Sequence, residues 1–351
     1  MEAIDGDAYL GLNHEGSDPA SIRYLTGFTG EGALLLSKRE AVLLTDSRYT
    51  EQAKGETDGL SIEEDRGWHL KATADAIAAR SLARVAFASS RVSFHWVEEM
   101  RKFAGFTLVP QQDPVGLLRR TKSPEEVGHL KRAAAIADEA FAALLPGLRA
   151  GMSEAEISLR LEVLIRETDA EGIAFGVNVS AGPNTALNHY NPALAPRILA
   201  EGDLLLFDFG ACYAGYRSDI TRTVSVGRAT EREREIYGIV LRANQSAIEA
   251  VRGGKAASDV DAVARTLISE AGYGDFFGHG LGHGIGLEVH EAPGLTPQNG
   301  NALEPGMVVT IEPGIYLPGF GGVRIEDDIV VSTDGCEVIT AFPKDELIEV
   351  G

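Results

Sequence analysis

Acidic residues within apolar, strand-like runs constrain the fold of this chain more than any other feature. Residues 204–210 read LLLFDFG, which places Asp208 inside a segment suited to a buried strand. A carboxylate there is costly unless it is paired or bound to a metal. Asp219 follows an Ala-Gly turn at 214–215, so a hairpin centred on that turn sets residue 208 opposite residues near 220. Both carboxylates can then share one face, although each alone could be a strand-end aspartate bonded within a local turn.

A second pair of acids repeats this pattern. The runs IEPGIY and GVRIEDD flank a turn near residue 319. Folding about that residue places Glu312 opposite Glu326, and Arg324 faces the same side because it lies two residues from Glu326. The competing interpretation is a solvated hairpin edge, to which Asp327 and Asp328 would belong.

A glycine-rich track supplies three histidines. Residues 278–286 read GHGLGHGIG, and five glycines in nine residues, at about 1 kcal/mol each relative to alanine, argue against a helix. In an extended chain these glycines share one face, which another backbone or a ligand can approach closely. A single histidine is more often structural, whereas His279, His283 and His290 within twelve residues indicate a site.

The charges of these segments predict a metal centre. If the two hairpins face one another, Asp208, Asp219, Glu312 and Glu326 converge, and they cannot all stay ionised without compensation. Two divalent cations balance the four charges, with His283 as a neutral fifth ligand. Such ligands suit Mn²⁺, which we expect, with Co²⁺, Fe²⁺ or Zn²⁺ as alternatives. Two metals about 3.5–4 Å apart can share a hydroxide and polarise a carbonyl, so the predicted reaction is metal-assisted hydrolysis.

The chain is long enough, at 351 residues, for two domains of ordinary size. In its first third, apolar runs between glycine turns predict strands, and longer stretches with helical patterns predict helices. The strands are expected at 22–24, 33–36, 41–45 and 84–88, and the helices at 70–82 and 96–103. This alternation predicts a small α/β domain, which we place at residues 1–118.

Residues 119–351 contain four helix-start signals. Each combines a serine or threonine at the N-cap with an acidic residue three positions later. They read SPEE at 123–126, SEAE at 153–156, TERE at 230–233 and SDVD at 258–261. These signals imply two helices followed by strands, and the same order then occurs a second time. We therefore expect an α+β domain with an internal pseudo-twofold repeat.

Charge and cysteine content exclude several classes of protein. The net charge of −20 argues against nucleic acid or an anionic membrane surface as a partner, because both would repel the chain. Cys212 and Cys336 cannot form a disulfide framework, which favours a reducing compartment. The acidic start of the chain lacks the apolar core of a signal peptide, and no apolar run reaches the ~20 residues that span a bilayer. We therefore expect a cytoplasmic protein.

Together these motifs resemble the Xaa-Pro peptidases of the pita-bread metallopeptidase family, which includes prolidase, aminopeptidase P and methionine aminopeptidase. That family orders its metal ligands Asp, Asp, His, Glu, Glu, and this chain supplies Asp208, Asp219, His283, Glu312 and Glu326. The glycine–histidine track, IEPGIY and GVRIED carry the resemblance, which covers nearly the whole chain. DSRY at 46–49 and IRYLTGF at 22–28 resemble the N-terminal domain of the creatinase and prolidase branch, which methionine aminopeptidases lack.

The resemblance implies roles for the ligands. Asp208 would chelate one metal, and Asp219 and Glu326 would bridge the two. His283 and Glu312 would complete the two coordination shells.

The resemblance also implies roles in catalysis and substrate binding. Glu312 would carry a proton from the water to the leaving nitrogen, and His290 would steady the tetrahedral intermediate. His279 and His189 match two further histidines of the substrate pocket. Arg324 would hold the carboxylate network in place.

The implied activity is hydrolysis of a bond to proline. We expect an Xaa-Pro dipeptidase (prolidase) that cuts before a C-terminal proline; the alternative is an aminopeptidase P, which removes the residue preceding proline from longer peptides. A dipeptidase must recognise a free carboxylate, and Arg48 is a candidate for this task or for a structural ion pair. The resemblance also suggests a homodimer. A non-catalytic scaffold or a metal-free creatine-type amidinohydrolase would be expected to lack the five ligands.

Overall fold

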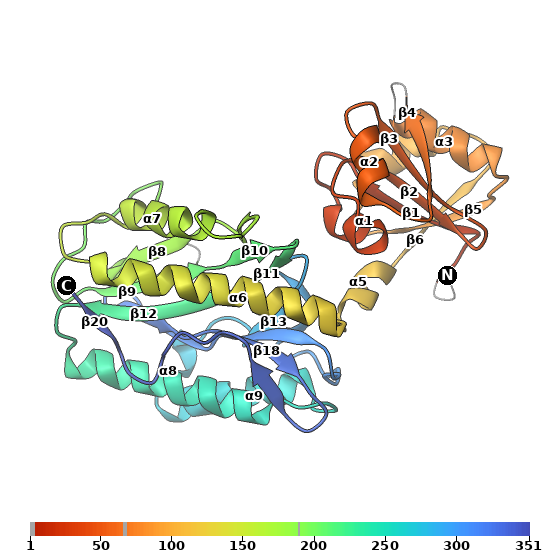
Figure 1. Ribbon diagram of the computed structural model, residues 1–351. Helices are drawn as coiled ribbons and strands as arrows, with labels where there is room; N and C mark the ends of the chain where they lie inside the picture. The colour runs from red at the N-terminus through yellow and green to blue at the C-terminus, as the bar shows by residue number, and fades with distance from the viewer. Residues whose placement is uncertain (1–3, 66–68, 189) are drawn as a thin grey trace. The chain divides into compact units, whose positions relative to one another are not determined.

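The computed structural model describes residues 4–65, 69–188 and 190–351, and it divides into two compact units, Met1–Arg119 and Arg120–Gly351 (Figure 1). The first unit is a six-stranded mixed sheet with strand order β4-β3-β2-β1-β5-β6. Its strands are β1 (Ala8–Asn13), β2 (Gly32–Ser37), β3 (Ala41–Asp46), β4 (Ser61–Asp65), β5 (Arg84–Ala88) and β6 (Thr107–Gln111). Its helices are α1 (Pro19–Thr26), α2 (Thr50–Glu56), α3 (His69–Ala79), α4 (Phe94–Met100) and α5 (Pro114–Arg119).

The predicted strand at residues 22–24 is wrong, because these residues lie in α1. Asp18 caps that helix by accepting the N–H of Ser21, and Pro19 occupies the first turn. Ile22 is buried on the inner face of the helix. A short apolar run does not by itself distinguish a helix from a strand, and here the cap decides. The helix expected at 96–103 is displaced and spans Phe94–Met100.

The second unit contains two helix pairs, each followed by antiparallel strands, as the sequence predicted. The helices are α6 (Pro124–Leu144), α7 (Glu154–Arg166), α8 (Glu231–Ala250) and α9 (Ala257–Glu270). One sheet, in the order β20-β12-β9-β8, comprises β8 (Asn178–Ala181), β9 (Leu204–Phe209), β12 (Ile220–Val226) and β20 (Glu349–Val350). The other, in the order β14-β13-β15-β18-β19, comprises β13 (Gly282–Gly284), β14 (Glu291–Leu295), β15 (Val308–Ile311), β18 (Asp327–Val331) and β19 (Cys336–Val338).

Short elements complete this unit. A three-stranded sheet contains β7 (Gly172–Ile173), β10 (Ala211–Tyr213) and β11 (Tyr216–Arg217). A two-stranded ribbon pairs β16 (Gly314–Leu317) with β17 (Gly321–Arg324). Three 3-10 turns are η1 (Leu145–Gly147), η2 (Gly182–Ala186) and η3 (Gly274–Phe276).

Three of the four predicted helix starts are confirmed. Reciprocal capping boxes begin α6 and α8, and Ser153 caps α7 by accepting the N–H of Glu156. The start predicted at 258–261 is wrong, because α9 begins at Ala257. Asp261 is buried within that helix, where it accepts the N–H of Leu281 at 3.0 Å and pairs with Arg265. Its carboxylate therefore fixes the glycine–histidine track instead of capping the helix.

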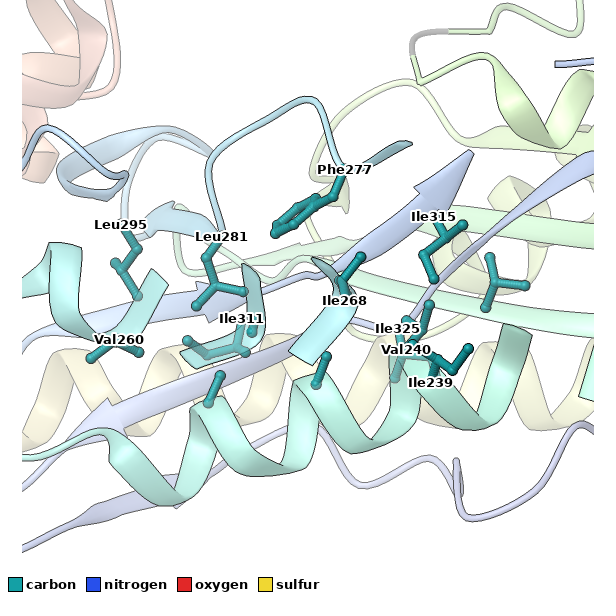
Figure 2. Packing of buried hydrophobic residues seen from close by; sticks show 14 of the residues in the cluster. Ile239, Val240, Val260, Ile268, Phe277, Leu281, Leu295, Ile311, Ile315 and Ile325 are labelled. Carbon is teal, nitrogen blue, oxygen red and sulfur yellow. The ribbon is translucent and has the colours of Figure 1, made fainter. Parts of the chain in front are cut away.

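Each half of this unit buries its own apolar core, and the two cores orient the acids. Phe207 and Phe209 of β9 pack against Phe141 of α6, with ring centroids 4.9 and 5.1 Å away. Because side chains alternate along a strand, Asp208 between them faces the opposite side. In the other half, Ile311 and Ile325 are buried against α8 and α9 (Figure 2). The residues that follow them, Glu312 and Glu326, are thereby turned out of that core.

Glu154, the first residue of α7, is fully buried and anchors the segment after β8. One carboxylate oxygen accepts the Ala181 N–H (2.7 Å) and the Asn184 amide (3.0 Å). The other accepts the Tyr190 hydroxyl and the Arg197 N–H, both at 2.6 Å. The three N–H groups can only donate, and they approach both oxygens, so an acceptor-only carboxylate matches them and an amide does not.

Glu154→Gln is therefore expected to destabilise the protein by about 2 kcal/mol, because its NH₂ group would face donors. It should also speed tryptic cleavage at Arg197, the single trypsin site between residues 167 and 216. Thermal unfolding and limited proteolysis measure the two effects. The exposed Glu156, on the same helix, provides the control Glu156→Gln. Equal cleavage rates in both variants and the wild type would contradict the anchoring role.

Candidate metal centre

The first acid pair lies in the hairpin that the sequence predicted. Strands β9 and β12 pair antiparallel with Asp208 opposite Thr221, in the same register as Tyr213 opposite Tyr216 at the turn. Thr221 and Asp219 are two residues apart, so Asp219 faces the same side as Asp208.

The second acid pair, Glu312 and Glu326, lies between two antiparallel strand pairs, β15–β18 and β16–β17, which have the same register. Ile311 is opposite Asp327 in β15–β18, and Gly314 is opposite Arg324 in β16–β17. This register places Glu312 opposite Glu326, as predicted.

The interpretation of Asp327 and Asp328 as a solvated edge is wrong. Their exposed fractions are 1% and 0%, because each lies against a residue of the first hairpin. Asp327 pairs with Arg222 at 3.0 Å and with Lys344. Asp328 accepts the N–H of Asp219 at 3.0 Å, so it helps to place that residue.

Hydrogen bonds join the two hairpins face to face. The Glu326 N–H donates to the Thr221 carbonyl at 3.1 Å, and the Thr221 hydroxyl donates to the Glu326 carboxylate at 2.6 Å. Arg324 extends from the second hairpin and donates to Asp208 of the first at 2.5 Å. The two pairs of acids therefore face one shared site.

The glycine track brings His283 to these acids. A Cβ on Gly282 would lie 2.0 Å from the Thr310 carbonyl oxygen, and one on Gly284 would lie 2.4 Å from that of Ala292. The sequence predicted that a backbone or a ligand would approach the glycine face closely, and here the backbone of neighbouring strands does so. The His283 Nδ1 lies 3.0 Å from the Gly284 carbonyl oxygen, which turns Nε2 towards the carboxylates.

A cavity of about 530 Å³ contains the convergent groups. Asp219, His283 and Glu326 each offer one ligand atom, and these three atoms lie within 4.8 Å of one another. The His283 Nε2 is 3.4 Å from a Glu312 oxygen and 3.7 Å from an Asp219 oxygen. The lining also includes Phe175, Asn188, Asp208, His279, Val289, His290 and Arg324.

The electrostatics of the cavity favour cations. Burial, together with repulsion from neighbouring carboxylates, raises the pKa of Asp219 and of Glu326 well above their ordinary values. Burial also raises the pKa of Glu312 to about 7 and lowers the pKa of His283 to about 4. An imidazole that stays neutral can bind a metal, whereas carboxylates in this setting hold their negative charge only beside compensating positive charge.

The residues present fit a pair of divalent cations. In the described part of the chain, one buried oxygen of Asp219 has no hydrogen-bond partner. Such an atom is costly unless a ligand satisfies it. The donor set of four carboxylates and one neutral imidazole matches oxygen-preferring divalent metals.

Sequence reasoning missed two polar residues of the site, Thr221 and Tyr316. The Tyr316 hydroxyl lies 2.9 Å from the His279 Nε2 and 3.2 Å from an Arg324 nitrogen. Arg324 also donates to the Thr221 hydroxyl at 2.8 Å. Strand periodicity could have identified both residues. Tyr316 is four residues from Glu312 and Thr221 is two from Asp219, and residues an even number apart on a strand face the same side.

The other expected site residues differ in their placement. The His290 ring lies 4.4 Å from the His283 ring and lines the cavity. His189 lies outside the described residues. Arg48 belongs to the N-terminal unit, where it pairs with Asp46 at 2.7 Å and with Glu31 at 3.3 Å. Those contacts match the structural ion pair that was the alternative for Arg48.

Comparison with known families agrees with this arrangement. Residues 128–333 match the metallopeptidase family M24, and residues 17–121 match the creatinase/prolidase N-terminal domain. The chain belongs to metallopeptidase family M24. Both acid hairpins and the glycine track of this M24 protein fall within the matched range.

Similar proteins cover the chain broadly. An Xaa-Pro dipeptidase from Pyrococcus horikoshii is 40% identical over 252 residues, which is 72% of this chain and 71% of the relative. The crystal structure of an X-Pro aminopeptidase from Thermotoga maritima has a TM-score of 0.92 and 39% identity, covering 99% of both chains. An Xaa-Pro dipeptidase from Bacillus anthracis has a TM-score of 0.93 and 41% identity, covering 98% of this chain and 95% of that one. The pita-bread catalytic domain with a creatinase-type N-terminal domain is thus confirmed.

Proposed function

We propose that this M24 peptidase is an Xaa-Pro dipeptidase, with residues 1–118 as the N-terminal domain and 119–351 as the catalytic domain. The observation that carries the proposal is the convergence of two acid pairs and a neutral histidine on one cavity. The similarity to proteins named Xaa-Pro dipeptidase supports it. Removal of an N-terminal residue from longer peptides is the second candidate, favoured by the Thermotoga structure.

The metals would be held by five residues, Asp208, Asp219, His283, Glu312 and Glu326. We propose Mn²⁺ as the native metal, with Co²⁺ or Zn²⁺ as alternatives. When bound, such a pair activates water and polarises the scissile carbonyl.

The chain's own residues would bind substrate and move protons. Phe175 and Val289 line the cavity and offer an apolar slot for the proline ring. A Glu312 oxygen would accept the proton of the attacking water and donate it to the prolyl nitrogen, which carries no hydrogen of its own. His290 would donate a hydrogen bond to the carbonyl oxygen as negative charge develops there.

Other side chains would orient these groups. Arg324 would keep Asp208 in place through their 2.5 Å contact. His279, bonded to Tyr316, and His189 would complete the substrate pocket.

Substrate length separates the two candidate functions. A panel of Xaa-Pro dipeptides and Xaa-Pro-Xaa tripeptides, assayed with Mn²⁺, Co²⁺ and Zn²⁺, should show higher kcat/KM for the dipeptides. Arg48→Ala should reduce dipeptide turnover more than tripeptide turnover if its guanidinium reads the free carboxylate. An equal loss on both would refute that role, and preference for tripeptides would establish the aminopeptidase instead.

We also propose that the protein is a cytoplasmic homodimer. Among the described residues, no helix combines the length and apolar content that crossing a bilayer requires. Light scattering during size-exclusion chromatography should give a mass of twice the 37.4 kDa chain.

A further inference from the structure

A buried ion pair lies behind the turn that carries His290. The Lys122 ammonium is 3.1 Å from a carboxylate oxygen of Glu291, and their side chains are 1% and 4% exposed. The two residues are 169 positions apart in the sequence. The backbone of Lys122 is held in place, because its N–H donates to the Gly306 carbonyl at 2.8 Å. Such a pair adds little net stability, since the loss of hydration offsets the attraction. Its placement therefore suggests a role other than stability.

The Glu291 carboxylate organises the turn between β13 and β14. Its second oxygen accepts the Glu288 N–H at 3.1 Å, and the Glu288 carbonyl accepts the Gly286 N–H at 3.0 Å. A Cβ on Gly286 would lie 2.8 Å from both Glu291 oxygens. The carboxylate thus occupies the space that a side chain at residue 286 would fill, and the turn closes around it.

This turn presents two residues to the metal cavity, Val289 and His290. Arg217 holds the part of the turn that follows β13. Its backbone N–H donates to the Gly286 carbonyl at 2.9 Å, and its side-chain Nε donates to the Leu287 carbonyl at 3.2 Å. His290 is exposed, and its ring lies 4.4 Å from the His283 ring. The bond from the Glu288 N–H to the Glu291 carboxylate is one of the contacts that close the turn carrying His290.

We propose that Lys122 and Glu291 are positioning residues that place His290 over the metal cavity, an inference that rests on the proposed peptidase function. Neither residue lines the cavity, and neither would touch substrate. Lys122 compensates the buried charge of Glu291. Glu291 in turn closes the turn that sets the position and orientation of the His290 imidazole. Misplacing a catalytic group by about 1 Å costs about 100-fold in rate.

Lys122→Met keeps most of the side-chain volume and removes the ammonium that lies 3.1 Å from Glu291. It should lower kcat/KM for an Xaa-Pro substrate by about 10- to 100-fold while the metal content stays unchanged. Lys131 forms an exposed pair with Glu337 at 2.7 Å in the same unit, so Lys131→Met is the matched control, expected within about twofold of wild type. If Lys122→Met does not fold, Glu291→Gln tests the same pair, since its amide oxygen can still accept the Glu288 N–H.

A double-mutant cycle with His290→Ala separates positioning from general damage. In the His290→Ala background, Lys122→Met should lower kcat/KM by less than about twofold, because the ring that the pair places is gone. An unchanged single variant, or a full multiplied loss in the double variant, overturns the proposal.

The imidazole ¹H–¹⁵N signals of His290, recorded with Zn²⁺ as the added metal, provide a readout that needs no turnover. They should move in Lys122→Met and stay in Lys131→Met, and unmoved signals in both overturn the proposal. A wild-type protein that cleaves no Xaa-Pro peptide would refute the proposed function, and these signals would still test the positioning.

Discussion

Glu312→Ala is expected to leave less than a tenth of wild-type turnover on an Xaa-Pro dipeptide. The residue would serve twice, as a metal ligand and as the group that moves the proton. Loss of a general base alone typically costs about 10²- to 10⁴-fold. The side chain lines the cavity, and one of its oxygens lies 3.4 Å from the His283 Nε2, so its removal alters the centre of the site. Steady-state kinetics at saturating metal measure the effect.

Two further variants make this result specific. Glu312→Gln keeps the size of the side chain and removes its basicity, so it should also lose most of its turnover. Glu304→Ala changes an exposed glutamate of the same unit and should stay close to wild type. More than a tenth of the activity surviving in Glu312→Ala would contradict the assigned role.

Metal removal is expected to abolish turnover and to lower the Tm, and added Mn²⁺ should restore both. Burial raises the pKa values of Asp219 and Glu326, and repulsion between the carboxylates that face one another raises them further. Ions that bind only the folded protein stabilise it, by about 2.7 kcal/mol at a free concentration of 100 times Kd. Chelation followed by dialysis, metal analysis and differential scanning calorimetry test both expectations.

Asp219→Asn tests the same metal dependence by changing one proposed ligand. It retains the shape of the side chain but removes the charge of a buried residue beside His283 and Glu326. Its Tm should respond to Mn²⁺ much less than that of the wild type. Full activity in protein shown to be free of metal would exclude a metal-dependent mechanism.

Strand periodicity and turn chemistry were enough to predict the local geometry of the site. The Ala-Gly turn at 214–215 set the partner of Asp208 to within one residue, since the structure pairs it with Thr221. The turn near residue 319 likewise set Glu312 opposite Glu326. Both predictions succeeded because register within a hairpin follows from the few residues between its strands.

Only the tertiary structure decided what surrounds each strand. A solvated edge for Asp327 and Asp328 was compatible with the sequence, and the structure buries them because Arg222 and Asp219 of the first hairpin lie against them. The contact between the hairpins depends on the bond from Thr221 to Glu326, 105 residues away. Alternation tells which face a side chain takes, and it is a local property of the backbone. What lies against that face depends on distant segments of the chain, so burial and the partners of Tyr316 required the fold.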